Sequence, residues 1–380
     1  MSNEANLAPW DEDELASVLD QGSDAEGELL HVLNTLRSDP DETPSEDLTR
    51  RIILVCEPAR RRVNPFLALA ATFLLLACSL LILERGPKER QLAVNDGIEW
   101  LVAQQESDGH WDPSKTGGHP VFTRGVTALA LMALMDSGRE KRYASVITAA
   151  GAYLMQRPPE REGQAFSYNE CLATLALMEM HKRQPTPPLK DHLDRALSSL
   201  VQRQNHFGGW GYETHRNFSY QKGAPANSSV TVWPLLALEQ AVAQGWAAYE
   251  APLRRARNWM ALQVDDTGYL GYRRPGDHPN GTQTLLAIGL LGLPDLPEGT
   301  RDRIRDNLIK ETSEKSDTYQ TYFAARALQQ DKKPLSRLQR QLMDRQGADG
   351  SWSSSQDWDG TGGRLVATAL AALSLSIDTP

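Results

Sequence analysis

The chain has 380 residues, of which 40% are hydrophobic and 23% charged, as is ordinary for a globular protein. Its formal net charge of −9 is unevenly distributed: the first 50 residues hold 14 Asp/Glu and 2 Lys/Arg, whereas the remainder holds 35 and 38. Most of the chain is therefore close to neutral and lacks the basic surface that nucleic-acid binding requires. Three widely spaced cysteines exclude a disulfide scaffold.

Residues 1–62 predict an acidic region with short helical segments. A weak helical periodicity of apolar side chains runs through its middle, at Leu29, Leu30, Val32, Leu33 and Leu36. A composition this rich in acidic residues buries little apolar surface, so a poorly ordered acidic arm is the alternative.

The next segment changes the class of protein. Residues 66–83 contain no charged side chain, and with the three residues before them they make 21 residues, close to the ~20 that cross a bilayer. We therefore predict a transmembrane helix over residues 63–84 and a linker over 85–90; a buried core helix is the alternative. Five basic residues precede the helix and three follow it, which favours a cytoplasmic N-terminus. The flanking basic residues are Arg50, Arg51, Arg60, Arg61, Arg62, Arg85, Lys88 and Arg90.

The region before this helix contains Pro44-x3-Leu48-x2-Arg51-Ile52-Ile53, followed by the basic patch. This arrangement resembles the cytoplasmic head of bacterial membrane anti-sigma factors, which implies a cytoplasmic protein partner for residues 1–62. Heads of the zinc-binding type carry a His-x3-Cys-x2-Cys cluster, whereas His31 stands alone here. The resemblance therefore implies no zinc in this region.

Beyond residue 90 the dominant signal is an internal repeat. Three stretches share Gln-x3-Gly-x-Trp, namely Gln105 to Trp111, Gln204 to Trp210 and Gln346 to Trp352. A looser copy starts at Gln263, and two weaker copies fill the remaining gaps. The pattern predicts six repeats between residues 91 and 377.

Each repeat predicts two helices of different character. The helix before each motif is amphipathic, so one face meets solvent. The helix after it is apolar on nearly all sides and rich in small residues, as in residues 126–134, 230–238 and 366–373, so it is buried. Alternation of outer and inner helices predicts an all-α fold of two concentric layers, an (α/α)6 toroid over residues 91–380. Within the motif, we expect the Gln to satisfy the end of its own helix, the Gly to permit a turn, and the Trp to pack on the next outer helix.

These motifs resemble the Gln-Trp repeats of the squalene/oxidosqualene cyclase and protein prenyltransferase β-subunit superfamily. The resemblance covers residues 91–377, and the stretch from Gly362 looks most like membrane-anchored bacterial members of the group. It implies a functional site at the mouth of the ring, where loops lead into the inner helices. It does not by itself imply catalysis, because the superfamily includes non-enzymatic members.

Cyclases of this superfamily need an Asp-x-Asp-Asp motif, in which one protonated carboxyl group donates to an alkene. The chain contains Asp265-Asp266, but these residues fall within a repeat turn and Gln263 stands at the first position. We expect them to be solvated turn residues. The residues that remain as weak candidates for a catalytic acid are Asp265, Asp266 and Asp317.

Prenyltransferases need zinc held by Asp, Cys and His. Cys171 is the one cysteine in the ring and lacks an Asp-x-Cys context, and His278 lacks partner ligands. A thioester motif is also absent from the sequence. We therefore expect no metal and no cofactor.

The sequence favours a single-pass protein of the bacterial cytoplasmic membrane. Its toroid would lie in the periplasm or outside the cell as a non-catalytic domain that binds a peptide, lipid or glycan and signals to the acidic arm. One alternative is a cyclase-like or prenyltransferase-like enzyme acting on an isoprenoid or lipid, and another is a structural envelope scaffold. The residues expected to line the binding mouth are Asn227, Ser228, Thr282, Gln283, Asp317 and Arg364.

Overall fold

The computed structural model describes residues 86–156, 166–212, 226–277, 282–355 and 360–378. The chain divides into two units, Met1–Glu89 and Arg90–Pro380. The predicted acidic region, residues 1–62, and the predicted transmembrane helix, residues 63–84, lie outside the described residues. Within the described ranges, no helix combines the length and the apolar run needed to cross a bilayer.

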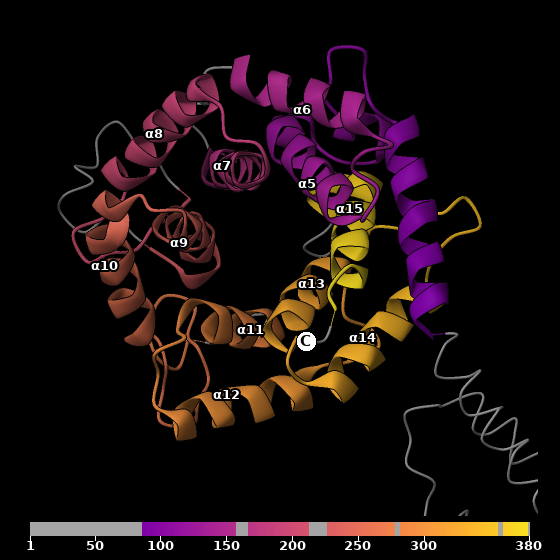
Figure 1. Cartoon of the computed structure of the whole chain (residues 1–380). Coiled ribbons are helices and arrows are strands. Elements are labelled where there is room, and N and C mark those ends of the chain that lie inside the picture. The colour runs from indigo at the N-terminus through magenta and orange to yellow at the C-terminus, as the bar shows by residue number, and fades with distance from the viewer. Residues whose placement is uncertain (1–85, 157–165, 213–225, 278–281, 356–359, 379–380) are drawn as a thin grey trace, which may run out of the picture. The chain divides into compact units, whose positions relative to one another are not determined.

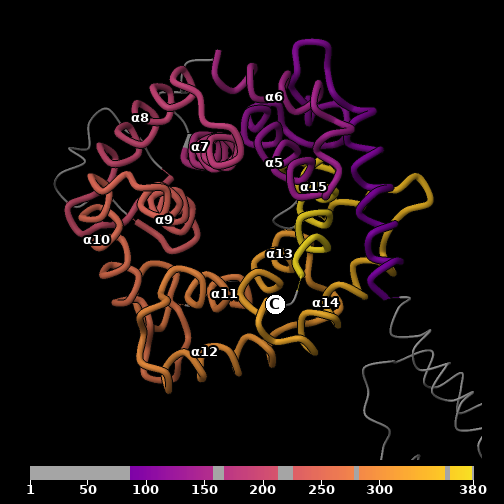
Figure 2. Tube along the Cα trace, in the orientation of Figure 1, coloured from indigo at the N-terminus to yellow at the C-terminus, as the bar shows by residue number. Residues whose placement is uncertain are grey.

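Among the described residues of the second unit, six inner helices form a closed ring (Figures 1 and 2). Each contacts the next in chain order, and the last, α15, contacts the first, α5. The inner helices are α5 (Thr123–Asp136), α7 (Phe166–Arg183), α9 (Ser228–Ala243), α11 (Thr282–Gly292), α13 (Thr318–Ala327) and α15 (Gly363–Leu375).

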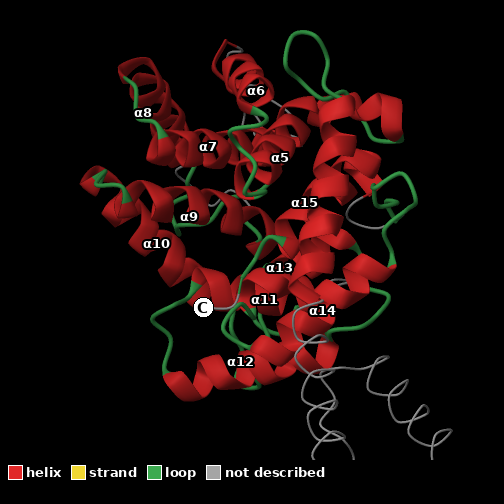
Figure 3. Cartoon of the chain, turned by 45° about the vertical axis from the view of Figure 1, so that its right-hand side comes forward, coloured by secondary structure: helices red, strands yellow, loops and turns green. Residues whose placement is uncertain are grey.

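Outer helices alternate with the inner ones along the chain and pack around them (Figure 1). The first occupies residues 86–103 as far as the structure describes it. The others are α6 (Ala144–Gln156), α8 (Pro187–Gln202), α10 (Glu250–Ala261), α12 (Glu298–Glu311) and α14 (Lys332–Asp344). The described residues contain helices and loops and no β-strand (Figure 3). The all-α prediction and its two-layer architecture are therefore confirmed for this unit.

The sequence of each helix explains its layer. In α9 every residue from Ser228 to Leu238 is buried, because both its outer and its lumen-facing sides meet protein. In α14 the buried Leu335, Leu338 and Leu342 recur at helical spacing between Lys, Arg and Asp residues. Such an apolar stripe can be buried only against another layer, which the inner ring supplies.

The repeated motif works as a brace between neighbouring outer helices. The indole N–H groups of Trp111, Trp210 and Trp352 donate to the carbonyl oxygens of Leu101, Leu200 and Leu342 at 2.7, 2.9 and 2.7 Å. These carbonyls lie near the C-terminal ends of the outer helices, where backbone acceptors lack helical partners. The Trp, not the Gln, thus satisfies the end of its own helix.

The Gln side chain instead links its turn to the following outer helix. The Nε2 of Gln204 donates to the carbonyl of Gly208 and to that of Pro252 in α10, both at 2.9 Å. Gln105 makes the same pair of bonds to Gly109 and to Val146 in α6, both at 3.0 Å. The expectation that Gln caps its own helix was therefore wrong for these two copies, because their amides reach the next repeat. In the looser copy it was right, since Gln263 donates to the carbonyl of Trp259 in its own helix at 2.7 Å.

The third brace closes the ring. Gln346 donates to the carbonyl of Ala93 in the first outer helix at 2.9 Å, although the two residues are 253 positions apart. Trp352 packs against Gly97 of the same helix, as expected for the motif Trp, because a Cβ at that glycine would meet the indole ring. The first and sixth repeats are thus joined like any other neighbours.

Candidate binding site at the mouth of the toroid

The mouth of the ring is the end at which loops enter the inner helices. Asn227 and Ser228, both predicted to bind ligand, begin α9 here and are buried. The Asn227 side-chain oxygen accepts from the backbone N–H of Val230 and from the Ser229 hydroxyl, each at 2.9 Å. Asn227 is therefore an N-cap for α9.

Ser228 positions a neighbouring loop. Its hydroxyl donates to the carbonyl of Gly271 at 2.7 Å, and its backbone N–H donates to the carbonyl of Tyr272 at 2.8 Å. Ser228 thereby fixes the backbone that carries the Tyr272 side chain.

Asp317 and Gln283 also serve the scaffold. The Asp317 carboxylate accepts from the backbone N–H of Gln320 at 2.7 Å, and the side-chain oxygen of Gln320 accepts from the backbone N–H of Asp317 at 3.1 Å. This pair of bonds is a capping box for α13. The oxygen of Gln283 accepts from the Ser316 hydroxyl at 2.6 Å. Thr282 is the first residue of α11 and is half-buried.

Arg364 lies apart from these residues. Its guanidinium pairs with Asp349 at 2.5 Å and stands over the ring of Trp100 in the first outer helix, 5.1 Å from the centroid. A hydrogen bond from Ser351 and the charge of Arg364 hold the pKa of Asp349 down at about 2. Arg364 thus reinforces the joint between the sixth and first repeats.

Asp265 and Asp266 occupy the turn of the fourth repeat. The Asp265 carboxylate accepts from the backbone N–H of Thr267 at 2.9 Å, from its hydroxyl at 2.6 Å and from the backbone N–H of Tyr269 at 3.0 Å. Asp266 is exposed. Both carboxylates lie where a polar turn needs them.

Three tyrosine hydroxyl groups, which the sequence did not single out, meet at the mouth. The hydroxyl of Tyr212 lies 3.2 Å from that of Tyr168 and 3.2 Å from that of Tyr272, and 3.4 Å from the hydroxyl of Ser229. Burial raises the pKa of Tyr168 and of Tyr272, and the neighbouring tyrosines raise both further. We call Tyr168, Tyr212, Tyr272 and Ser229 the hydroxyl cluster.

Aromatic rings meet across the lumen. Trp233 of α9 lies 5.1 Å from Phe323, 6.3 Å from Tyr319 and 6.5 Å from Tyr322, all on α13. Helices α9 and α13 are separated in the ring by α11, so these rings reach toward one another over the lumen side. Burial raises the pKa of Tyr319, and the nearby Trp233 and Tyr168 partly offset that increase.

Known proteins resemble this chain in sequence and in fold. No known family profile matches the chain. The squalene–hopene cyclase of Bradyrhizobium diazoefficiens is 26% identical over 205 residues, a match that covers 47% of this chain and 30% of the cyclase. The chain thus matches less than a third of the length of that enzyme.

Two solved structures superpose on most of the second unit. The type II terpene cyclase MstE from Scytonema, in complex with geranylgeranyl dihydroxybenzoate, gives a TM-score of 0.54 at 14% identity and covers 77% of this chain and 98% of its own. The α-1,6-mannanase GH76A of Salegentibacter sp. HEL1_6 gives 0.55 at 12% identity, covering 76% and 98%. The described part of residues 90–380 is an α/α toroid similar in fold to these two proteins.

The toroid places Cys171 in its core. The thiol is buried, which raises its pKa well above the usual range. Among the residues that the structure describes, no three His, Cys, Asp or Glu side chains are arranged to hold a metal ion. His278, the other residue weighed for zinc, lies outside the described ranges. A buried thiol of this kind fills space in the core.

A buried ion pair joins two neighbouring inner helices of the toroid near the mouth. The Nε of Arg124 in α5 lies 2.8 Å from a carboxylate oxygen of Glu170 in α7, and the two side chains are 6% and 4% exposed. Arg124 also donates to the carbonyl of Leu154 at 2.8 Å. On the outer helix α8, burial and the charge of Arg124 lower the pKa of His192 to about 4, so this histidine is neutral at physiological pH.

Proposed function

We propose that the toroid is a non-catalytic binding domain and that its ligand is a neutral glycan. The observation that carries this proposal is the hydroxyl cluster, whose three tyrosines come from different parts of the chain. The hydroxyl groups of Tyr168 and Tyr272 each lie 3.2 Å from the hydroxyl group of Tyr212. Each hydroxyl both donates and accepts, as sugar hydroxyls do. The aromatic rings that carry them offer apolar faces to the C–H faces of a sugar.

The hydrogen bonds of the Asp265 and Asp317 carboxylates also support a binding role. A cyclase of this superfamily needs a carboxyl group that faces the lumen and stays protonated. The Asp317 carboxylate caps α13, and the Asp265 carboxylate bonds within its own turn. In addition, Trp233 and the α13 aromatics meet where a polyprenyl chain would have to lie.

Tyr212→Phe tests the proposal, because it removes the hydroxyl at the centre of the cluster and keeps the ring. We expect about tenfold weaker binding of a neutral oligosaccharide such as α-1,6-mannotriose, since two hydrogen bonds lose a partner. Titration calorimetry on the full-length chain in detergent micelles measures it. Tyr269→Phe is the matched control: the Tyr269 hydroxyl donates to Glu311 at 2.9 Å, away from the cluster, and its loss should leave binding unchanged.

An enzymatic role is the second candidate, and the similarity to squalene–hopene cyclase favours it. The same preparation should be incubated with squalene and geranylgeraniol. A cyclised product that disappears in Asp317→Asn would establish the enzyme and overturn the binding proposal. If neither oligosaccharides nor isoprenoids bind, the structural scaffold becomes the preferred role.

We also propose that residues 63–84 anchor the toroid outside the cytoplasmic membrane and that residues 1–62 bind a cytoplasmic protein. The uncharged run at 66–83 and the basic residues before it support this orientation. In intact spheroplasts, added protease should digest the toroid region and spare residues 1–62, and inverted vesicles should give the reverse. Leu75→Arg with Leu76→Arg should release the chain from the membrane fraction, whereas Leu75→Ile with Leu76→Ile should not. Digestion of residues 1–62 in intact spheroplasts would contradict the orientation.

A further inference from the structure

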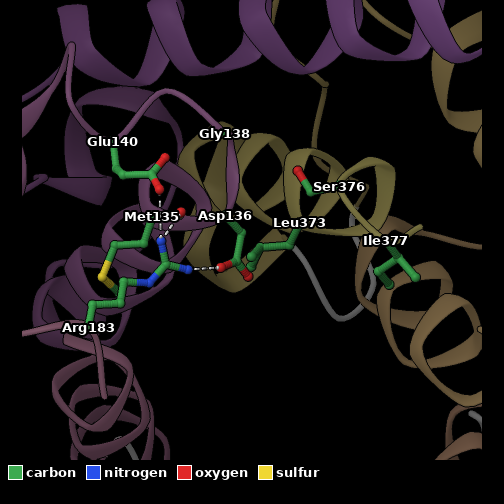
Figure 4. Close-up of a pocket in the computed structure, with 8 residues that line it drawn as sticks. All are labelled: Met135, Asp136, Gly138, Glu140, Arg183, Leu373, Ser376 and Ile377. Atoms are coloured by element: carbon green, nitrogen blue, oxygen red, sulfur yellow. Dashed lines mark hydrogen bonds and ion pairs between the residues drawn. The ribbon is translucent and has the colours of Figure 1, made fainter. Parts of the chain in front are cut away.

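A cavity of ≈ 330 Å³ opens at the end of the toroid opposite the mouth, where the inner helices finish (Figure 4). Arg183 of α7 is one of the residues that line it. Its guanidinium donates to Asp136 at 2.8 Å, to the carbonyl of Met135 at 2.5 Å and to Glu179 at 2.9 Å. The lining residues are Met135, Asp136, Gly138, Glu140, Arg183, Leu373, Ser376 and Ile377.

The cavity has two walls of different origin. One wall comes from the C-terminal ends of α5 and α7 and is fixed by Arg183 (Figure 4). The other wall comes from the end of α15 and the residues after it, represented by Leu373, Ser376 and Ile377. The distance between these walls sets the width of the cavity.

Arg90 of the first outer helix holds the α15 wall. It donates to the carbonyl of Ile377 and to the side-chain oxygen of Gln339, both at 3.1 Å, and it forms an ion pair with Asp378. Gln339 donates to the same Ile377 carbonyl at 2.8 Å. The chain after α15 is therefore fixed to residue 90 by two direct contacts and by a third path through Gln339.

Gln91, the next residue, holds the opposite wall. Its amide donates to the carbonyl of Ser137 at 3.2 Å, directly after the cavity residue Asp136. The same amide donates to Asn95 at 3.1 Å, which fixes its orientation within the helix. Two consecutive residues of one helix thus bind one wall each.

We infer that Arg90 and Gln91 form a latch that sets the width of this cavity. A shift or rotation of the helix at residue 90 moves both contact sets at once, because the two side chains share one backbone. Residue 90 lies six positions after the proposed membrane helix, so the latch is placed to couple that helix to the cavity. This coupling rests on the proposed membrane anchor, whereas the latch depends only on contacts within Arg90–Pro380.

Spin labels at Glu140→Cys and Ser376→Cys, one on each wall, test the latch in the full-length chain in detergent micelles. Cys56→Ser and Cys78→Ser remove the competing thiols, and Cys171 is buried. Arg90→Ala and Gln91→Ala should each lengthen the mean distance between labels and make its distribution about twofold wider. Asp378→Asn removes only the ion pair, so it should give a smaller change with little risk to folding.

Lys190→Ala is the matched control. Lys190 forms a 2.8 Å ion pair with Asp194 within α8, an outer helix that contributes no residue to the cavity lining, so its loss should leave the distribution unchanged. Amide exchange in the unlabelled Arg90→Ala chain gives a second readout: the last turn of α15 should exchange about tenfold faster. Unchanged distances and unchanged exchange in the latch variants would overturn the inference, whether or not the chain proves to be membrane-anchored.

Discussion

Glu170→Ala should lower the free energy of unfolding by about 3–5 kcal/mol. The substitution would remove the carboxylate that lies 2.8 Å from Arg124 and would leave the guanidinium charge buried without this counter-ion. The loss would also leave a cavity between α5 and α7, two inner helices in direct contact. Urea unfolding of the full-length chain in detergent micelles, followed by tryptophan fluorescence, measures the change.

The double variant Arg124→Met with Glu170→Leu is the control for this prediction. It removes both charges and fills similar volume, so it should recover most of the lost stability, less the hydrogen bond that Arg124 donates to Leu154. If the double variant is as unstable as Glu170→Ala, packing around Glu170 matters more than its charge. A wild-type midpoint for Glu170→Ala would contradict the account of the ion pair.

Gly208→Ala should cost about 3–4 kcal/mol of stability, because two penalties add. Gly208 has φ +105°, a backbone region that L-residues disfavour. A Cβ at this position would also lie 2.2 Å from the carbonyl oxygen of Arg255 in α10, so the second brace and the next outer helix would have to separate.

Gly245→Ala separates the two penalties. Gly245 has φ +94°, but a Cβ there would meet no atom within 4 Å. It should therefore cost only about 1 kcal/mol, the backbone term alone. The same urea titration compares the two variants. Equal losses would show that the brace tolerates separation of α10 from its turn.

The architecture could be predicted because the same sequence pattern recurs in successive repeats. Three copies of Gln-x3-Gly-x-Trp locate the ends of outer helices, and the all-apolar runs after them identify the inner layer. The hydrogen-bond partners of the Gln and Trp side chains within the motif could not be predicted. Whether the Gln amide or the Trp indole caps a helix depends on which carbonyl lies within 3 Å, and that carbonyl belongs to the next repeat for Gln204.

The candidate site was harder to predict for a related reason. Polar residues at the start of an inner helix, such as Asn227 and Asp317, are suited equally to a ligand and to the helix's own unpaired N–H groups. The structure commits their side chains to capping. The hydroxyl cluster left no sequence signal, because Tyr168 of α7 meets Tyr212 and Tyr272 only when the loops that carry these two residues fold over the mouth.

The bond from Gln346 to Ala93 has a consequence for synthesis of the chain. An open solenoid can fold repeat by repeat as it leaves the ribosome, since each unit needs only its predecessor. Here the first outer helix has no partner on one side until residues near 346 have been made. Contacts so distant in sequence form slowly, and the side of the first outer helix that carries Ala93 and Gly97 stays uncovered while the chain is incomplete. A truncated translation product would therefore leave this side exposed permanently, and we expect such products to be targets for chaperones and proteases.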